Sequence, residues 1–220
     1  MKSLPMPAHY DRNAVDKIWE PDYANLAEEG PKWAKKHGIR TAATDKLRIA
    51  VMGIDIQNTF AIPGFELFVG GRSGTGAVDD TRRTVEFGYR NLGVITKYIP
   101  TMDTHTVQQI FHPDFIIDRN GNHPAPHTTI AYADVKAGKW SVNPSSGDRG
   151  GGFHSQWLQS ELLGYCRILE EKGKFQLTIW PYHAMLGGIG HALVPSFHEM
   201  IMFHSFVRDT DADPETKGGN

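Results

Sequence analysis

The sequence lacks the features that mark several large classes of protein. Its single cysteine, Cys166, excludes an internal disulfide and favours a reducing, cytoplasmic setting. No apolar run approaches the roughly 20 residues that span a bilayer, and the N-terminus has no apolar stretch of the secretory kind, so we expect no membrane partner. The net charge of -2 gives no electrostatic reason to expect nucleic acid as a partner.

The remaining composition is that of one ordinary globular domain. The chain has 220 residues, of which 40% are hydrophobic and 22% charged, enough to bury a core without a disulfide or a structural metal. Residues 1–45 are polar and contain proline, so we interpret them as an N-terminal extension with a short helix near 24–36. Residues 46–220 then form the domain.

Short apolar runs alternate with stretches of helical spacing along this domain. The run from Leu47 to Asp55 is nearly continuous and ends in an acid, as is typical of a strand buried on both faces. The complete pattern predicts strands at 47–55, 97–103 and 175–180, and helices at 81–95, 155–172 and 194–207. Strands and helices that alternate in this way indicate an α/β fold with a parallel sheet.

Two stretches depart from this alternation. Residues 104 to about 152 are rich in Gly, Pro, His and Asn and predict a long irregular connection, which in a compact domain is usually functional. The chain ends in a polar segment from Asp209, where a fourth strand would be expected. We therefore expect the sequence to be the N-terminal part of a larger domain, whose open sheet edge could pair with a second copy in a homo-oligomer.

Polar side chains follow each predicted strand. Asp55 ends the first strand, Asp103 ends the second, and His183 follows the third by a few residues. Ligands of parallel sheets bind at the carboxyl ends of the strands. We therefore expect these side chains to converge on one site, although Asp55 could instead cap the next turn.

The acid and imidazole of Asp103-Thr-His105 suggest a metal site. Residues two apart in an extended backbone point to the same side, so the pair could bind one divalent ion such as Zn, Fe or Mn. His183 would complete a three-ligand site, and His112 is a candidate further ligand or neighbour. The alternatives are a turn or capping role for Asp103 and hydrogen-bonded structural roles for the histidines.

The order of three motifs resembles the isochorismatase-like cysteine hydrolases, and within them the nicotinamidases. The motifs are D-I-Q-N-T-F at 55–60, D-T-H at 103–105 and W-P-Y-H at 180–183, the last followed by a Gly-rich turn. The resemblance covers about residues 47–220. It implies a three-layer parallel sheet with helices on both faces, incomplete here at its C-terminal end, with a long insertion at about 111–153.

The resemblance also implies roles for individual residues. Asp55 would be the general base that accepts a thiol proton, with Lys217, followed by Gly218, supporting it; Lys217 could instead be a solvated surface residue. Phe60 and Trp180 would flank a flat ring substrate, or could simply be core. The implied metal ligands are Asp103, His105 and His183, with His112 as a fourth candidate.

The sequence departs from the family pattern at the nucleophile. In the family this is a cysteine on a later strand-to-helix turn, and no residue here occupies that position. Cys166 precedes W-P-Y-H and lies on the apolar face of a predicted helix, so we expect an unreactive core residue. Ala184 stands where nicotinamidases commonly have a cysteine, and Thr59 replaces a common acid.

The resulting expectation is a hydrolase of the nicotinamidase type, which cleaves a small-molecule heteroaromatic carboxamide to acid and ammonia through a cysteine thioester. These 220 residues alone are expected to bind a divalent metal but to turn over little substrate. Two alternatives remain: another C–N hydrolase of the fold acting on a carbamoyl or ureido substrate, and a non-catalytic member that binds a metal or a partner.

Overall fold

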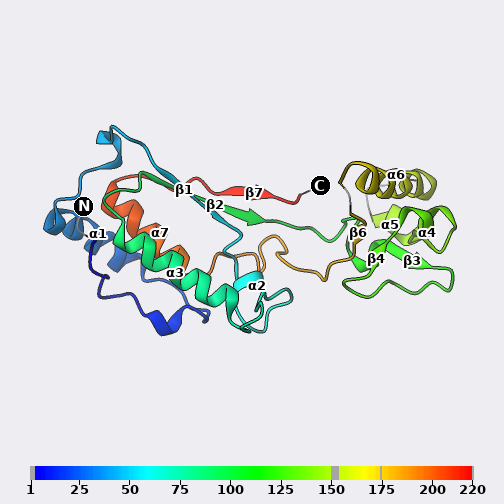
Figure 1. The fold of residues 1–220 in the computed structure, drawn as a ribbon, viewed down its shortest axis with the longest axis horizontal. Coiled ribbons are helices and arrows are strands. Elements are labelled where there is room, and N and C mark those ends of the chain that lie inside the picture. Colours follow the sequence, from blue (N-terminus) through cyan, green and yellow to red (C-terminus); the bar gives the residue numbers. More distant parts are fainter. Residues whose placement is uncertain (1–2, 150–153, 174, 220) are drawn as a thin grey trace. The chain divides into compact units, whose positions relative to one another are not determined.

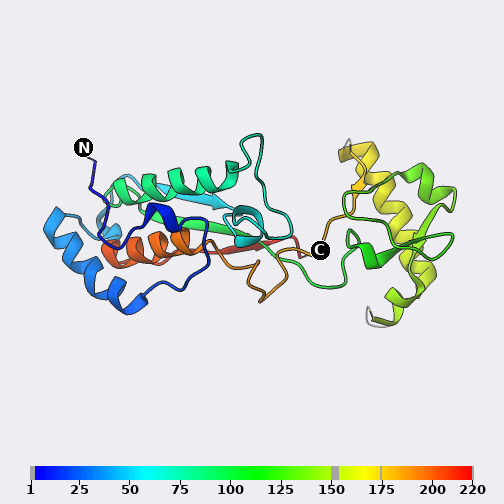
Figure 2. The ribbon, with the colours of Figure 1, turned by 90° about the horizontal axis from the view of Figure 1, so that it is seen from below.

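The computed structural model describes residues 3–149, 154–173 and 175–219. The chain divides into two compact units (Figures 1 and 2). The first unit comprises Met1–Thr104 and Ala184–Gly219, and the second comprises His105–His183. Within the described ranges, no helix combines the length and the apolar character that a bilayer span requires.

The first unit is a mixed α/β structure. Its helices and strands are η1 (Arg12–Ala14), α1 (Tyr23–His37), η2 (Ala42–Thr44), β1 (Ala50–Ile54), α2 (Asn58–Ala61), α3 (Gly76–Arg90), β2 (Lys97–Asp103), α7 (Pro195–Arg208) and β7 (Glu215–Lys217). The predicted helices near 24–36 and 194–207 and the strand at 97–103 are confirmed. The helix predicted at 81–95 is confirmed only as far as Arg90, because α3 begins earlier, at Gly76, and ends there. Gly38 ends α1 in the left-handed conformation, with φ 65°, as expected of a glycine after a helix.

The strands of this unit form a parallel sheet in the order β1-β2-β7. Ala50 of β1 pairs with Lys97 of β2, and Asp103 of β2 pairs with Lys217 of β7. The strands are therefore added to the sheet in the order of the sequence, each on the same side of the one before. Right-handed connections between strands added in this way place all their helices on one face of the sheet. In Figure 1, α3 and α7 lie together beneath the strands.

This arrangement leaves β1 open on one face. Gly53 faces α7, where an added Cβ atom would collide with the ring of Phe197. Met52 and Ile54, which point the other way, are 56% and 64% exposed. The prediction that β1 is buried on both faces is wrong, because both crossovers lie on the same side. Over the described residues of this unit, helices cover that one face, so the full three-layer fold stays an expectation.

The third strand of the sheet is not the one that the sequence predicts. Of the predicted strand 175–180, only β6 (Leu177–Thr178) forms, and it pairs antiparallel with β4 (Thr129–Ile130) in the second unit. The third parallel strand is β7, from the segment interpreted as a polar tail. The three residues of β7 are all exposed, so the strand has no apolar pattern by which it could be recognised.

The second unit has a core of its own. Its elements are η3 (Pro113–Phe115), β3 (Ile116–Asp118), β4, α4 (Tyr132–Lys136), β5 (Trp140–Val142), α5 (Pro144–Arg149), α6 (Ser155–Ile168), the π-helical turn η4 (Leu169–Gly173) and β6. β3 pairs antiparallel with β5. The buried residues are Ile116, Ile130, Val135, Val142, Leu162, Cys166, Leu177 and Ile179.

The prediction of an irregular connection over 104–152 is therefore wrong for its described part. The expected insertion at 111–153 lies inside a folded unit, although its residues 150–153 fall outside the described residues. Its strands and α4 have two to five residues each, too short to give a periodic signal. The predicted helix at 155–172 is confirmed as α6 with its final turn.

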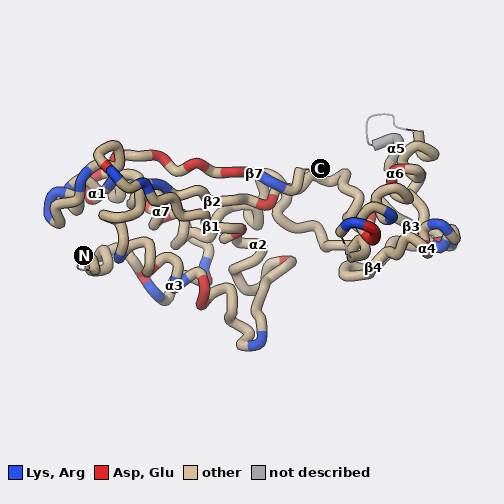
Figure 3. Tube along the Cα trace, turned by 45° about the horizontal axis from the view of Figure 1, so that its top comes forward, with Lys and Arg blue, Asp and Glu red and all other residues tan. Residues whose placement is uncertain are grey.

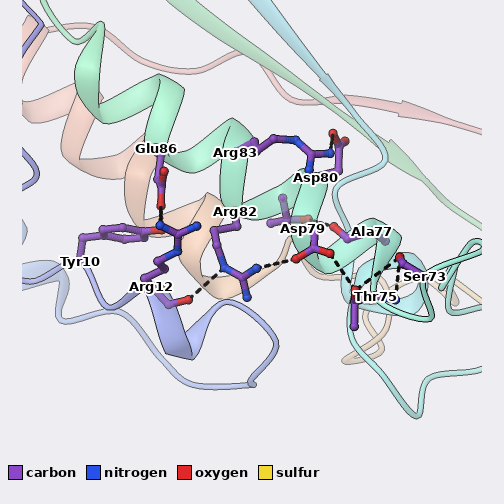
Figure 4. Close-up of polar contacts among 11 residues, drawn as sticks. Tyr10, Arg12, Ser73, Thr75, Ala77, Asp79, Asp80, Arg82, Arg83 and Glu86 are labelled. Atoms are coloured by element: carbon purple, nitrogen blue, oxygen red, sulfur yellow. Dashed lines mark hydrogen bonds and ion pairs between the residues drawn. The ribbon is translucent and has the colours of Figure 1, made fainter.

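The N-terminal segment is held to α3 by polar contacts (Figure 4). The Tyr10 hydroxyl donates to Glu86 Oε1 at 3.3 Å, and an Arg12 Nη1 lies 3.4 Å from the same oxygen. Arg82 Nε donates to the Arg12 carbonyl, and Arg82 Nη1 pairs with Asp79 at 2.6 Å. Burial and the neighbouring Glu86 carboxylate raise the pKa of Tyr10 to about 12. The extension thus packs on the first unit.

A buried acid in the same unit should make its stability depend on pH. Glu199 of α7 is 5% exposed and accepts a hydrogen bond from the Tyr89 hydroxyl at 3.3 Å. His9 Nε2 lies 3.2 Å from that hydroxyl. Burial raises the pKa of Glu199 from 4.5 to about 7. The folded protein therefore holds this proton more tightly than the unfolded chain does.

Because the folded-state pKa is raised, the stabilising contribution of Glu199 is complete below pH 4.5 and is lost as the pH rises to about 7. We expect Glu199→Gln to gain free energy of unfolding relative to wild type over this interval, by about 1.4 kcal/mol for each unit of pKa shift. Urea denaturation of both proteins from pH 5 to pH 8 measures the difference. Parallel pH profiles would contradict the assignment.

Candidate metal and hydrolase site

Three charged side chains meet at the carboxyl end of the parallel sheet. Asp55 directly follows β1, Asp103 is the last residue of β2, and Lys217 is the last residue of β7. The Lys217 Nζ lies 2.8 Å from Asp55 Oδ2 and 3.4 Å from Asp103 Oδ1. In Figure 3, the blue, basic end of β7 lies beside a red, acidic part of the sheet. The structure thus brings together three residues that the sequence analysis selected separately.

The two carboxylates control the charge state of the lysine. Burial by itself would lower the pKa of Lys217, but hydrogen bonds and charge attraction from Asp55 and Asp103 outweigh it and raise the pKa above its ordinary value. Lys217 therefore stays protonated at neutral pH. It holds two acids close together that would otherwise repel each other.

Asp55 has an unusual backbone, which a neighbouring threonine fixes. Its φ of 54° lies in the left-handed region, which is uncommon for residues other than glycine and often marks functional sites. Thr101 Oγ1 donates to Asp55 Oδ1 at 3.0 Å and accepts from the Asp55 N–H at 3.2 Å. One carboxylate oxygen of Asp55 thus contacts Thr101 and the other contacts Lys217.

Gln57 plays the corresponding part for Asp103. It is fully buried, its Oε1 accepts from the Asp103 N–H at 2.8 Å, and its Nε2 donates to the Asp103 carbonyl at 2.8 Å. The sequence analysis missed both Gln57 and Thr101. Thr101 could have been found, because it lies two residues before Asp103, on the same side of the extended strand β2. Gln57 gave no such signal, because the left-handed backbone at Asp55 interrupts the extended segment.

Asp103 also belongs to a group of potential metal ligands. One ligand atom from each of Asp103, His105 and His183 lies within 4.8 Å of the others. Asp103 and His105 are close because they are two residues apart, and His105 and His183 are the first and last residues of the second unit. The rings of the two histidines have centroids 4.6 Å apart. An acid and two buried imidazoles are a fitting donor set for a divalent transition metal.

Hydrogen bonds set the ring nitrogen that His183 can offer. Its Nδ1 lies 2.7 Å from the Pro181 carbonyl oxygen. A carbonyl can only accept, so Nδ1 carries the proton and Nε2 is the ring nitrogen that would coordinate a metal, as is common for metal-binding histidines. His105 and His183 are 5% and 4% exposed. This environment excludes most of the water that would compete for a metal.

His112 lies beside this group without belonging to it. Its ring centroid is 6.1 Å from that of His105. Its Nδ1 lies 3.1 Å from the Val107 carbonyl, and its buried Nε2 has no hydrogen-bond partner among the described residues. Burial lowers the pKa of His112, which favours the neutral ring. Its role as a fourth ligand stays a prediction.

The two aromatic candidates lie in different units. Phe60 is a partly buried residue of α2 in the first unit. Trp180 belongs to the second unit, is 37% exposed, and has its ring centroid 6.4 Å from that of His183. Phe111, which the sequence analysis did not select, lies 4.9 Å from the His105 ring. The aromatic surroundings of the histidines therefore come from Phe111 as well as from Trp180.

Cys166 is a core residue of the second unit, as predicted. It is fully buried in α6. Burial and the nearby Glu170 raise the pKa of its thiol to about 11, so it is protonated and a poor nucleophile at neutral pH. Thr59, which stands where the family commonly has an acid, donates a hydrogen bond from its hydroxyl to the Glu66 carboxylate at 3.1 Å. An acid therefore lies beside this position, although it comes from residue 66.

Comparisons of the chain with protein-family models, with curated proteins and with solved structures found no match. The geometry at the carboxyl end of the sheet and the order of the sequence motifs are therefore the basis for a functional proposal.

Proposed function

We propose that the chain provides the general base and the metal site of a nicotinamidase-type amide hydrolase. Such an enzyme cleaves a heteroaromatic carboxamide to an acid and ammonia. The observation that carries the proposal is the double position of Asp103. Its carboxylate contacts Lys217, which pairs with Asp55, and it also belongs to the Asp/His/His group. Asp103 therefore links the base, through Lys217, to the metal ligands. A base and a metal site that lie this close together could both act on one bound amide.

The proposed reaction uses Asp55 as a proton carrier. Asp55 accepts the proton of a cysteine thiol that these 220 residues do not themselves supply, and the thiolate sulfur bonds to the amide carbon. The C–N bond then breaks, and the nitrogen leaves as ammonia with the proton that Asp55 returns. Water hydrolyses the thioester and regenerates the thiol. Lys217 pairs with one carboxylate oxygen of Asp55 and Thr101 donates to the other, and these two contacts fix the orientation of the base.

The metal would be held by Asp103, His105 and His183, and a bound divalent ion orients a ring nitrogen and polarises water. Phe60 and Trp180 would lie against the faces of the ring. The proposal includes the three-layer fold of the family, in which helices also cover the sheet face that bears Met52 and Ile54.

Ligand binding to the metal-loaded chain tests this proposal without requiring turnover. With Co²⁺ bound, nicotinamide should change the visible absorption spectrum because its ring nitrogen approaches the ion. Benzamide has the same shape and amide but no ring nitrogen, so it should change the spectrum far less. Equal effects of the two amides, or no effect of either, would count against a heteroaromatic carboxamide as substrate.

A second candidate is a non-catalytic protein that binds a metal through the same residues. The observation in its favour is that the one cysteine of the sequence, Cys166, is buried and protonated. We expect the 220-residue polypeptide to release no ammonia from nicotinamide, and Cys166→Ser to leave this result unchanged. A coupled ammonia assay on both proteins makes the measurement. Activity that disappears in Cys166→Ser would contradict our assignment of this residue to the core.

A further inference from the structure

The first unit contains a cavity away from the site described above. Its volume is about 760 Å³, within the range of roughly 300–1,000 Å³ common for small-molecule sites. Asp45 lines it and accepts a hydrogen bond from Thr96, which directly precedes β2. The cavity therefore lies at the amino ends of the parallel strands, whereas Asp55 and Asp103 lie at their carboxyl ends.

The charged residues of the cavity are mostly arginines. Arg40, Arg90 and Arg208 line it, and Asp45 is the one acid among the described residues that line it. These three arginines and one aspartate together carry a formal charge of about +2, with histidine left out of the count. Arg208 pairs with Asp45, and Arg90 Nη2 lies 3.7 Å from Glu86 of the same helix. Arg40 has no ion pair within 4.0 Å among the described residues.

Arg208 is the most informative of these residues. It is 1% exposed, and its Nη1 donates to the Gly93 carbonyl at 3.2 Å. Its Nε is buried and has no hydrogen-bond partner among the described residues, and the same is true of His37 Nε2. Buried donors without acceptors are costly. The Arg208 Nε is such a donor, in a residue that lines the cavity, which points to an acceptor supplied by a ligand. The His37 Nε2 could donate or accept, according to the tautomer of the ring.

The arginines also have a structural role, which the test below must separate from binding. The cavity lies where α1, α3 and α7 end, at His37, Arg90 and Arg208. Helix C-termini attract cations. In that role the Nη1 of Arg208 donates to a carbonyl oxygen, but the Nε still has no acceptor among the described residues.

We propose that this cavity binds a small molecule that carries a phosphate group. A phosphate monoester has a charge of about −1.5 to −2 at neutral pH, which matches the excess positive charge of the cavity. Guanidinium groups present donors in a planar fork that suits phosphate oxygens. Leu4, Ile39 and Val94 supply an apolar wall for an organic portion. The proposal is independent of the hydrolase function, because it uses none of the residues at the carboxyl end of the sheet.

Calorimetric titration of the full 220-residue chain with phenyl phosphate tests the proposal. Wild type should bind it, and the double variant Arg40→Gln/Arg90→Gln should bind it about tenfold more weakly or worse. Both arginines are exposed enough for the variant to fold. The matched control is Arg72→Gln/Arg83→Gln, which loses the same charge from exposed positions outside the cavity. Its affinity should stay within about twofold of wild type.

An NMR titration adds a readout that a purely structural role would not move. The Nε–H signal of Arg208 should shift as phenyl phosphate is added to wild type. Tighter binding of phenyl phosphate than of inorganic phosphate would assign the cavity to an organic phosphate, and equal affinities would assign it to free phosphate. The proposal would be overturned if wild type did not bind phenyl phosphate, or if both double variants lost affinity for it equally. It would also be overturned if wild type bound phenol as tightly as phenyl phosphate, or if the Arg208 signal did not move.

Discussion

Replacement of His183 by alanine is expected to weaken divalent metal binding by the chain roughly 100-fold or more. Loss of a contact behind a metal ligand already costs about 10- to 100-fold in affinity, and loss of the ligand itself should cost at least as much. His183 is one of the three residues in the group, and because its Nδ1 is hydrogen-bonded to Pro181, Nε2 is the ring nitrogen that would coordinate the ion. Competition titration of Zn²⁺ against a chromophoric chelator measures the affinity.

The control for this experiment is His154→Ala. His154 belongs to the same unit but is exposed, and it is not part of the ligand group. Removal of the His154 ring should leave the metal affinity unchanged. A loss of affinity in His183→Ala is then specific to the His183 ring and does not follow from the loss of any histidine. The proteins should carry no histidine tag. Equal metal affinity of wild type and His183→Ala would show that the Asp/His/His group is not the binding site.

Gly30→Ala is expected to destabilise the first unit by about 3 kcal/mol, the upper part of the usual range for overpacking a core. Gly30 is buried where α1 packs on α7, and an added Cβ would lie 2.5 Å from Phe206 Cβ and 3.1 Å from the Phe206 carbonyl carbon. Those atoms belong to or adjoin the backbone of α7 and cannot turn away. Pro31 follows, and a residue with a side chain before proline resists helical geometry.

Gly164→Ala is the matched substitution and should have the opposite sign. Gly164 lies inside α6, and apart from the backbone of its own helix an added Cβ would meet no atom of the described residues within 4 Å. Alanine in a helix interior is favoured over glycine by about 0.5–1 kcal/mol. Chemical denaturation of both variants, followed by circular dichroism, gives the two free energies. A stability of Gly30→Ala at or above that of wild type would show that α1 and α7 are less closely packed than described.

The site residues could be found from the sequence because strand ends have a local signature. Asp55 and Asp103 each follow an apolar run, and parallel strands deliver such residues to one edge whatever the rest of the fold does. Lys217 could be selected only through the family resemblance, since β7 has three exposed residues and no apolar pattern. The contacts of Lys217 with both acids give that selection a physical basis.

The predictions that failed depend on contacts between distant parts of the chain. The run 175–180 has the composition of a buried strand, and its residues Leu177 and Ile179 are indeed buried, but in the core of the second unit. The composition of a segment indicates that it is buried, but it does not show which strand the segment pairs with. Likewise, the apolar character of Met52 and Ile54 predicts two covered faces, whereas the direction of both crossovers covers one.

The central claim is that Asp103, His105 and His183 bind one metal ion together, and X-ray absorption spectroscopy of the chain loaded with a single equivalent of Zn²⁺ tests it most directly. The account predicts one ion per chain with scattering from two imidazoles and from oxygen ligands at about 2.0–2.2 Å, and loss of imidazole scattering in the His105→Ala/His183→Ala double variant. A bound ion without imidazole ligands, or one whose spectrum is the same in that variant, would contradict it.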